Sequence, residues 1–289
     1  MEHNKLVEKE LLIIEQYFFP DGWSGTQYPV NIAERMIEEG WKVNVICGNV
    51  PYINKNFYKN DPREKGVKIK YIKLPFHQKN TFHKLSNHIF FSIISFLRIS
   101  FSKKPTLIMV LTNPPPIIIV VYLIKKIFNI PFIIVAMDLY PEVLLKYLSK
   151  KYAIILDKII SPFFNISYRS ASKVVSLGDS MNKKLLKKGI QKNKIQIIRN
   201  WAIGEFNNIK GTNKFIKEWG INSDLTILYS GNLGLAHEWE TLLEAMRISE
   251  LKPKELKILF VASGQRLYEA KKYAKKYLDK DSVLFKSFD

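Results

Sequence analysis

Residues 10–47 read ELLIIEQYFFPDGWSGTQYPVNIAERMIEEGWKVNVIC. The apolar run at residues 10–15 is typical of a short buried strand, and the amphipathic pattern at residues 26–39 predicts a helix that Gly40 ends. A second apolar run, KVNVIC, follows at residues 42–47. Because two strands joined by a helix lie parallel in one sheet, this stretch predicts an α/β fold.

The alternation of strands and helices continues along the chain and restarts once. A polar stretch at residues 200–219 lacks clear periodicity and is interpreted as a linker or a peripheral loop. We therefore predict two Rossmann-like domains, residues 1–205 and 206–289, the second being incomplete with about three strands. The other expected strands are residues 68–73, 106–111, 131–136, 173–177, 194–198, 226–229, 256–262 and 282–285. The other expected helices are residues 82–102, 117–128, 141–150, 154–170, 179–188, 240–246 and 267–278.

The chain is strongly basic, with 45 basic and 26 acidic residues and a net charge of +19. Such a charge suits an anionic partner, but a lysine-rich composition from an AT-rich genome gives the same excess. No basic motif with interleaved aromatic residues is present, so nucleic acid is not a predicted partner. The single cysteine, Cys47, excludes an internal disulfide, and the charged N-terminus is unlike a signal peptide. We therefore expect a cytoplasmic protein.

Glycines mark a strand-to-helix turn late in the chain, in SGNLG at residues 230–234. Gly231 and Gly234 allow backbone N–H groups to approach an anion, so an anion-binding cradle is one interpretation and an ordinary tight turn is the other. The stretch is not G-x-G-x-x-G, and the chain has no Walker A loop. The first turn, DGWSG, argues against a nucleotide-sugar oxidoreductase or epimerase of the dinucleotide-binding type.

Five motifs in order carry a family resemblance: IEQYFFPDGWSGTQ, AMDLYPE, VVSLGDSM, IIRNW and LYSGNLGLAHEWETLLEA. Together they resemble bacterial retaining glycosyltransferases of family 4, which have the two-domain type-B fold, and most closely the colanic-acid and fucosamine transferases. The resemblance implies transfer of a sugar from a UDP- or GDP-sugar, without metal or cofactor, to a lipid-linked or saccharide acceptor. The product is expected to be a cell-surface polysaccharide such as O-antigen, capsule or exopolysaccharide.

The resemblance also implies roles for individual residues. It gives Gly22 and Gly25 to a glycine loop that faces the diphosphate and the acceptor. The other expected donor-binding residues are Arg199, Gly231, Asn232, Gly234, Gly264 and Arg266. Many relatives carry arginine and lysine at the late turn, where this sequence has Asn232 and His237, so Arg199 and Arg266 are candidate substitutes; a solvated surface role is the alternative for each arginine.

Asp138 is the expected catalytic residue, because it follows a buried strand where a carboxylate can orient a sugar hydroxyl or assist its deprotonation. Asp138 would alternatively cap a helix that begins near Pro141.

The segment at residues 82–101 is predicted either to pack on the sheet or to dock peripherally on the cytoplasmic face of the inner membrane. Its apolar stripe is flanked by cationic side chains, which suits an anionic leaflet that presents a lipid-linked sugar. The apolar runs at residues 89–101 and 117–134 contain charges or proline and are not expected to span a bilayer. The flanking candidates are His77, Lys79, Lys84, Arg98, Lys103 and Lys104. The spacing of His77, His83 and His88 does not fit a zinc site.

The resemblance has one gap, since the family's second domain continues through further strands and a pair of glutamates that hold the donor. We therefore expect a C-terminally truncated chain. A catalytically incomplete fragment that acts as a binding subunit, or half of a split transferase, is the alternative function.

Overall fold

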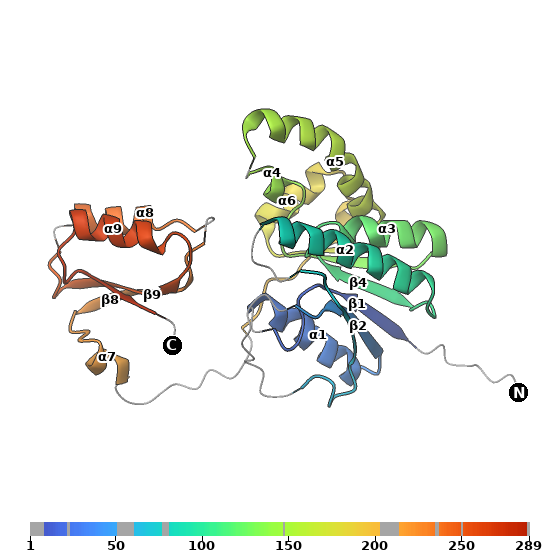
Figure 1. Ribbon diagram of the computed structural model, residues 1–289, viewed down its shortest axis with the longest axis horizontal. Helices are drawn as coiled ribbons and strands as arrows, with labels where there is room; N and C mark the ends of the chain where they lie inside the picture. Colours follow the sequence, from blue (N-terminus) through green and yellow to red (C-terminus); the bar gives the residue numbers. More distant parts are fainter. Residues whose placement is uncertain are drawn as a thin grey trace, which may run out of the picture. The chain divides into compact units, whose positions relative to one another are not determined.

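The computed structural model describes residues 9–21, 24–50, 61–76, 81–146, 148–202, 214–234, 237–249 and 251–287. The chain divides into two compact units, Met1–Gly204 and Glu205–Asp289. Each contains a parallel β-sheet with helices packed on it (Figure 1). The predicted α/β fold, with a large parallel sheet and a smaller second one, is therefore confirmed.

The sheet of the first unit has seven strands in the order β3-β2-β1-β4-β5-β6-β7. The chain runs from β1 outward to β3, then crosses back to place β4 on the other side of β1, where Ile13 pairs with Met109. The strand order therefore reverses between β1 and β4. The strands are β1 (Glu10–Ile14), β2 (Lys42–Gly48), β3 (Lys68–Ile72), β4 (Leu107–Leu111), β5 (Phe132–Ala136), β6 (Lys173–Ser176) and β7 (Ile195–Ile197).

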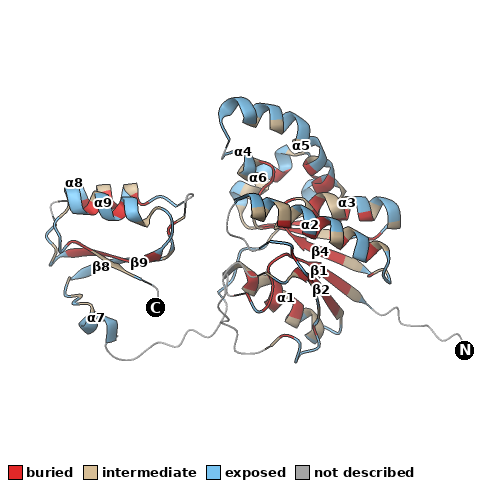
Figure 2. Cartoon of the chain, in the orientation of Figure 1, coloured by how far each residue is buried: buried red, intermediate tan, exposed pale blue. Residues whose placement is uncertain are grey.

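Helices cover both faces of this sheet, with α1 on one face and α2 and α3 on the other (Figure 1). Side chains that alternate along β1 supply both layers: Leu11 and Ile13 pack on the α1 side, whereas Leu12 and Ile14 pack on the opposite side. The buried residues accordingly concentrate at the sheet and at the inner faces of the helices (Figure 2). The helical segments are η1 (Ser24–Thr26), α1 (Gln27–Glu38), α2 (Thr81–Ser100), α3 (Ile117–Phe128), α4 (Glu142–Leu145), α5 (Lys150–Ser170), α6 (Asp179–Lys187) and η2 (Lys192–Lys194).

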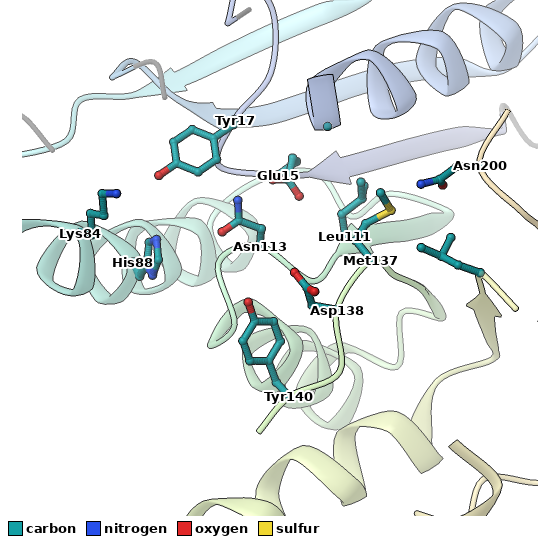
Figure 3. A pocket seen from close by; sticks show the side chains of 12 residues that line it. Glu15, Tyr17, Lys84, His88, Leu111, Asn113, Met137, Asp138, Tyr140 and Asn200 are labelled. Atoms are coloured by element: carbon teal, nitrogen blue, oxygen red, sulfur yellow. The ribbon is translucent and has the colours of Figure 1, made fainter. Parts of the chain in front are cut away.

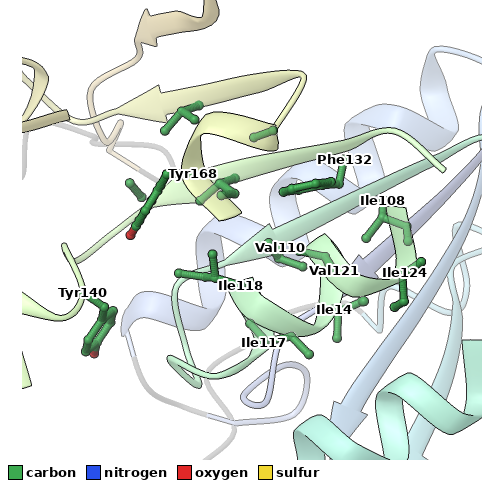
Figure 4. Packing of buried hydrophobic residues seen from close by; sticks show 14 of the residues in the cluster. Ile14, Ile108, Val110, Ile117, Ile118, Val121, Ile124, Phe132, Tyr140 and Tyr168 are labelled. Atoms are coloured by element: carbon green, nitrogen blue, oxygen red, sulfur yellow. The ribbon is translucent and has the colours of Figure 1, made fainter. Parts of the chain in front are cut away.

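The α3 helix forms the centre of the larger core. Its side chains Ile117, Ile118, Val121 and Ile124 are fully buried and lie over strand residues such as Val110 (Figure 4). Burial of one such side chain contributes roughly 1.5–3 kcal/mol. This packing fixes the helical layer beside the carboxyl ends of β1, β4 and β5.

The second unit has a three-stranded parallel sheet in the order β10-β9-β8. Its core joins Leu243 and Met246 of α8 to Ile258 and Phe260 of β9. The elements are α7 (Lys214–Glu218), β8 (Leu225–Asn232), α8 (Glu240–Ile248), β9 (Leu256–Ser263), α9 (Leu267–Tyr277) and β10 (Val283–Lys286).

Three predicted boundaries are wrong. The turn expected at residues 230–234 begins only after Asn232, because Gly231 and Asn232 still pair with β9. The stretch at residues 200–219, interpreted as a linker or a peripheral loop, contains α7, and the helix expected at residues 141–150 is only the four residues of α4.

Candidate functional site

A pocket of about 380 Å³ opens at the carboxyl edge of the seven-stranded sheet (Figure 3). It lies where the strand order reverses, since it is lined from the ends of β1, β4, β5 and β6. Open parallel sheets bind ligands at this kind of position. The lining residues are Glu15, Tyr17, Gly25, Lys84, His88, Leu111, Asn113, Met137, Asp138, Tyr140, Leu177 and Asn200.

Asp138 lines this pocket from the loop after β5. Its backbone N–H donates a hydrogen bond to Thr112 Oγ1 at 2.9 Å, which ties the loop to the end of β4. The carboxyl group is open to solvent on one side, yet the pocket wall removes enough water to raise its pKa above the ordinary value. Pro141 occupies the N-cap position of α4, so the alternative that Asp138 caps this helix is wrong.

Glu15 is a second carboxyl group in the same pocket, and the sequence analysis did not single it out. Only 2% of Glu15 is exposed, and burial raises its pKa well above the ordinary value. The side-chain amide of Asn113 and the backbone N–H of Tyr17 lie near the carboxyl group and oppose this shift, but neither reaches hydrogen-bonding geometry with its oxygens. The sequence signal that could have identified Glu15 is a carboxyl residue directly after the apolar residues of a buried strand.

The α2 helix contributes His88 and Lys84 to the pocket wall. Burial, and secondarily the charge of Lys84, lowers the pKa of His88 to about 4, so this imidazole is neutral at physiological pH. His83 instead stacks on Phe76, with ring centroids 4.9 Å apart. In the described part of the chain, no three His, Cys, Asp or Glu side chains converge as metal ligands. His77 and Lys79 lie outside the described residues.

Of the residues expected near the glycine loop, Gly25 lines the pocket beside Asp138. Gly22 lies outside the described residues. Arg199 does not line the pocket, and its guanidinium lies 3.8 Å from the carboxylate of Asp179, both side chains being exposed. Its neighbour Asn200 does reach the pocket wall.

In the second unit, the expected donor-binding glycines lie at the carboxyl ends of β8 and β9. A Cβ atom at Gly264 would lie 2.5 Å from Asn232 Oδ1, so only glycine allows the two chain segments to approach this closely. The other two expected donor-binding glycines are Gly231, whose φ is +152°, and Gly234. The Gly234 N–H donates to His237 Nδ1 at 3.3 Å, so this histidine supports the loop.

Arg266 lies in the same loop region but is held by neighbouring groups. Its guanidinium pairs with Glu240 and, at 3.2 Å, with Glu269, and it donates to the backbone oxygen of His237 at 2.9 Å. It also lies over the Trp239 ring. Two carboxylates therefore share its charge, and the side chain is largely shielded from solvent.

None of the described helices has the length and apolarity needed to span a bilayer.

Known structures share the architecture of this chain. Sucrose-phosphate synthase from Thermosynechococcus elongatus superposes with a TM-score of 0.65 at 14% identity, covering 97% of this chain and 71% of that chain. The catalytic domain of starch synthase IV from Arabidopsis thaliana, bound to ADP and acarbose, gives 0.60 at 11% identity, with 97% and 74% covered. Anabaena HepE in complex with UDP-glucose gives 0.58 at 14% identity, with 97% and 69% covered. At these identities the likeness establishes the type-B fold alone.

The sequence matches no curated protein. It does match the model of Glycosyltransferase Family 4 over residues 25–202, which is more than half of the chain and lies within the first unit. The matched region contains the pocket residues Gly25, Asn113 and Asp138. Together with a type-B fold, this match shows that the chain is a glycosyltransferase that belongs to family 4.

Proposed function

We propose that this enzyme transfers a sugar from a nucleotide diphosphate sugar to a lipid-linked saccharide in the assembly of a cell-surface polysaccharide, as colanic-acid and fucosamine transferases do, with retention of anomeric configuration. The observation that carries the proposal is the pocket at the sheet reversal, where Asp138 lies in the family-matched region. Because its pKa is raised, the Asp138 carboxylate is a stronger base than an ordinary aspartate and is better suited to accept the proton of an attacking hydroxyl group.

The donor diphosphate has a proposed site in the second unit. The ends of β8 and β9 meet at Asn232 and Gly264, where the missing Cβ of glycine allows the two chain segments to approach closely, and we place the diphosphate at this edge of the sheet. In this proposal Gly231, Asn232, Gly234, Gly264 and Arg266 serve the UDP- or GDP-sugar, and no metal ion is needed. Anabaena HepE has been solved with UDP-glucose, which agrees with this substrate class.

The outer surface of α2 supports a lipid-linked acceptor. Its buried face contains Phe91 and Ile99 together with the polar side chains Asn87, Ser92 and Ser95, and further apolar side chains point outward. The outward apolar side chains depart from the usual arrangement of a helix on a soluble core, whose outer face is polar. The exposed apolar residues of α2 are Phe82, Leu85, Ile89, Phe90, Ile93 and Leu97.

Neighbouring helices extend this apolar surface and add positive charge. Exposed apolar residues continue on α3 and α5, and Phe101 follows the end of α2 with 88% of its surface exposed. Exposed basic residues lie among them, including Arg98 of α2 and Lys150 and Lys151 of α5. Apolar side chains surrounded by cations suit the surface of an anionic bilayer, so we assign this surface to the cytoplasmic leaflet that holds the acceptor.

Two measurements on the full chain test the reaction. Isothermal titration with UDP and GDP should show binding of at least one nucleotide, weakened by Asn232→Ala. Incubation of labelled UDP- and GDP-sugars with polyprenyl-diphosphate-linked saccharides should then give a labelled lipid product, unchanged by EDTA. Absence of both nucleotide binding and transfer across these panels would overturn the proposed reaction.

Flotation with vesicles of phosphatidylglycerol and phosphatidylcholine tests the membrane surface. The double variant Ile89→Ser/Ile93→Ser removes two exposed side chains one turn apart on α2 and should reduce vesicle binding about tenfold or more. The matched control Ile248→Ser removes an exposed isoleucine from α8 and should leave binding unchanged. Equal binding by both variants would contradict the assignment.

A further inference from the structure

We infer that Glu15 is a specificity-determining residue of the pocket, where its carboxyl group hydrogen-bonds a hydroxyl group of the acceptor sugar. This inference rests on the proposed function, because it assigns an acceptor contact for glycosyl transfer. The resemblance to family 4 and the site expectations from the sequence give Glu15 no role.

The geometry carries the inference. Glu15 lines the pocket, is almost fully buried, and has no hydrogen-bond partner for either carboxyl oxygen among the described residues. A buried polar group without a partner destabilises a fold, so it needs a separate explanation. Figure 3 shows Glu15, Asn113 and Asp138 around the same space, approaching from the ends of three adjacent strands. Both oxygens are covered by neighbouring protein atoms, so the side chain must turn toward that space before a ligand there supplies the missing partner.

The surroundings of Glu15 select an uncharged ligand. The carboxylate of Asp138 faces the pocket and would repel a phosphate group, whereas a neutral Glu15 can bond an uncharged one. The rest of the wall is largely apolar or aromatic, with Tyr17 and Tyr140 at its sides. Flat aromatic surfaces beside polar groups suit a sugar ring, which has C–H faces and hydroxyl edges.

The protonation of Glu15 fits a hydroxyl partner. Burial favours the neutral carboxylic acid, which donates one hydrogen bond and accepts others, as a sugar hydroxyl also does. Two titratable groups around it carry no charge: Cys47 of β2 is a buried thiol with a raised pKa, and His88 of α2 is neutral. Lys84 and Asp138 also line the pocket.

Ligand-observed NMR with methyl glycosides of glucose, galactose, mannose and N-acetylglucosamine tests the assignment on the full chain. At least one glycoside should bind the unmodified protein. Glu15→Leu should weaken that binding about tenfold, whereas Glu15→Gln, which keeps a neutral donor and acceptor, should retain it within about threefold. Glu10→Gln is the control, because Glu10 lies at the opposite end of β1 and pairs with Asn44 and Lys42.

Deoxy analogues of the bound glycoside distinguish the loss of a direct contact with Glu15 from a general disturbance of the pocket. One analogue should bind the unmodified protein about tenfold more weakly than its parent, and Glu15→Leu should remove this difference because its partner is gone. The inference is overturned if every analogue keeps the same affinity ratio in both proteins, or if no glycoside binds. Neither result affects nucleotide binding or transfer to the lipid, so failure of the inference is distinct from failure of the proposed function.

Discussion

At the scale of single residues, Glu15 links stability to pH. The folded chain keeps the Glu15 proton at pH values where the unfolded chain has lost it, because burial raises the folded-state pKa above 4.5. Stability is therefore lost as pH rises above 4.5, until the folded-state carboxyl group also ionises. Glu15→Gln should remove this loss, gaining about 1.4 kcal/mol per pH unit relative to the unmodified protein in that window.

Urea unfolding at a series of pH values measures this difference. Glu38→Gln is the control with the opposite sign, since hydrogen bonding to Arg35 lowers the pKa of Glu38 and its carboxylate stabilises the fold as pH rises. A difference between Glu15→Gln and the unmodified protein that does not change with pH would contradict an unusually protonated Glu15.

Asp138 acts at the same scale but on the reaction. Asp138→Asn keeps the size of the side chain and removes its ability to accept a proton, so turnover should fall about 100-fold or more while nucleotide binding persists. Turnover of the unmodified enzyme should also fall as pH decreases through the raised pKa of Asp138, because the carboxylate is the working form. Initial rates across pH, with circular dichroism to verify folding, measure both effects.

Asp157→Asn is the matched control for Asp138→Asn, because Asp157 is exposed on α5, where its carboxylate accepts a hydrogen bond from the Ser161 hydroxyl. Retention of nearly full turnover by Asp138→Asn would remove Asp138 from the mechanism.

Alanine substitutions at two glycines of the second unit distinguish the cost of backbone strain from the cost of steric overlap. Gly264→Ala introduces a Cβ 2.5 Å from Asn232 Oδ1 at a φ of +118°, whereas Gly231→Ala meets nothing within 4 Å at a φ of +152°. The first should destabilise the unit by about 3 kcal/mol and the second by about 1–2 kcal/mol. Hydrogen exchange of β8 and β9 amides measures the difference, and equal losses would mean that strain alone requires Gly264.

At the scale of elements, α3 shows when a sequence pattern is sufficient to predict the bounds of a helix. The helix was predicted at residues 117–128 and is observed at Ile117–Phe128, because three prolines precede it and Asn129 ends it with a positive φ. The end of β8 was misjudged, since glycine usually marks a turn, but Gly231 here remains in the ladder opposite Ala262. Pairing with a partner strand overrode the local signal.

The α3 helix also offers a matched pair of isoleucines. Ile118 is fully buried against the sheet, whereas 60% of Ile127 is exposed on the outer side. Ile118→Ala should cost about 2–5 kcal/mol of unfolding free energy, and Ile127→Ala should change it by no more than about 0.5 kcal/mol. Urea denaturation measures both, and similar losses would contradict the observed orientation of the helix.

At the scale of the whole molecule, the sequence predicted parallel sheets and a site that contains Gly25 and Asp138, but not the strand order that brings Glu15 beside them. The order of strands depends on which side of β1 each crossover returns to, and local patterns carry little of that information. Glu15 was overlooked for the same reason. In the sequence Glu15 simply follows the apolar residues of one strand. It becomes part of a site because the fold brings Asn113 and Asp138 beside it from neighbouring strands.

Net charge is a property of the whole chain, and it predicts how vesicle binding depends on salt. An excess of 19 positive charges attracts an anionic surface over a distance that shrinks from about 10 Å in 0.1 M salt to about 3 Å in 1 M salt. Binding to phosphatidylglycerol vesicles should therefore fall about tenfold or more across this range of NaCl. The binding that persists at high salt should depend on apolar contact, and Ile89→Ser/Ile93→Ser should abolish it. Vesicles of phosphatidylcholine alone are the control; equal binding to them at low salt would mean that charge has no part in docking.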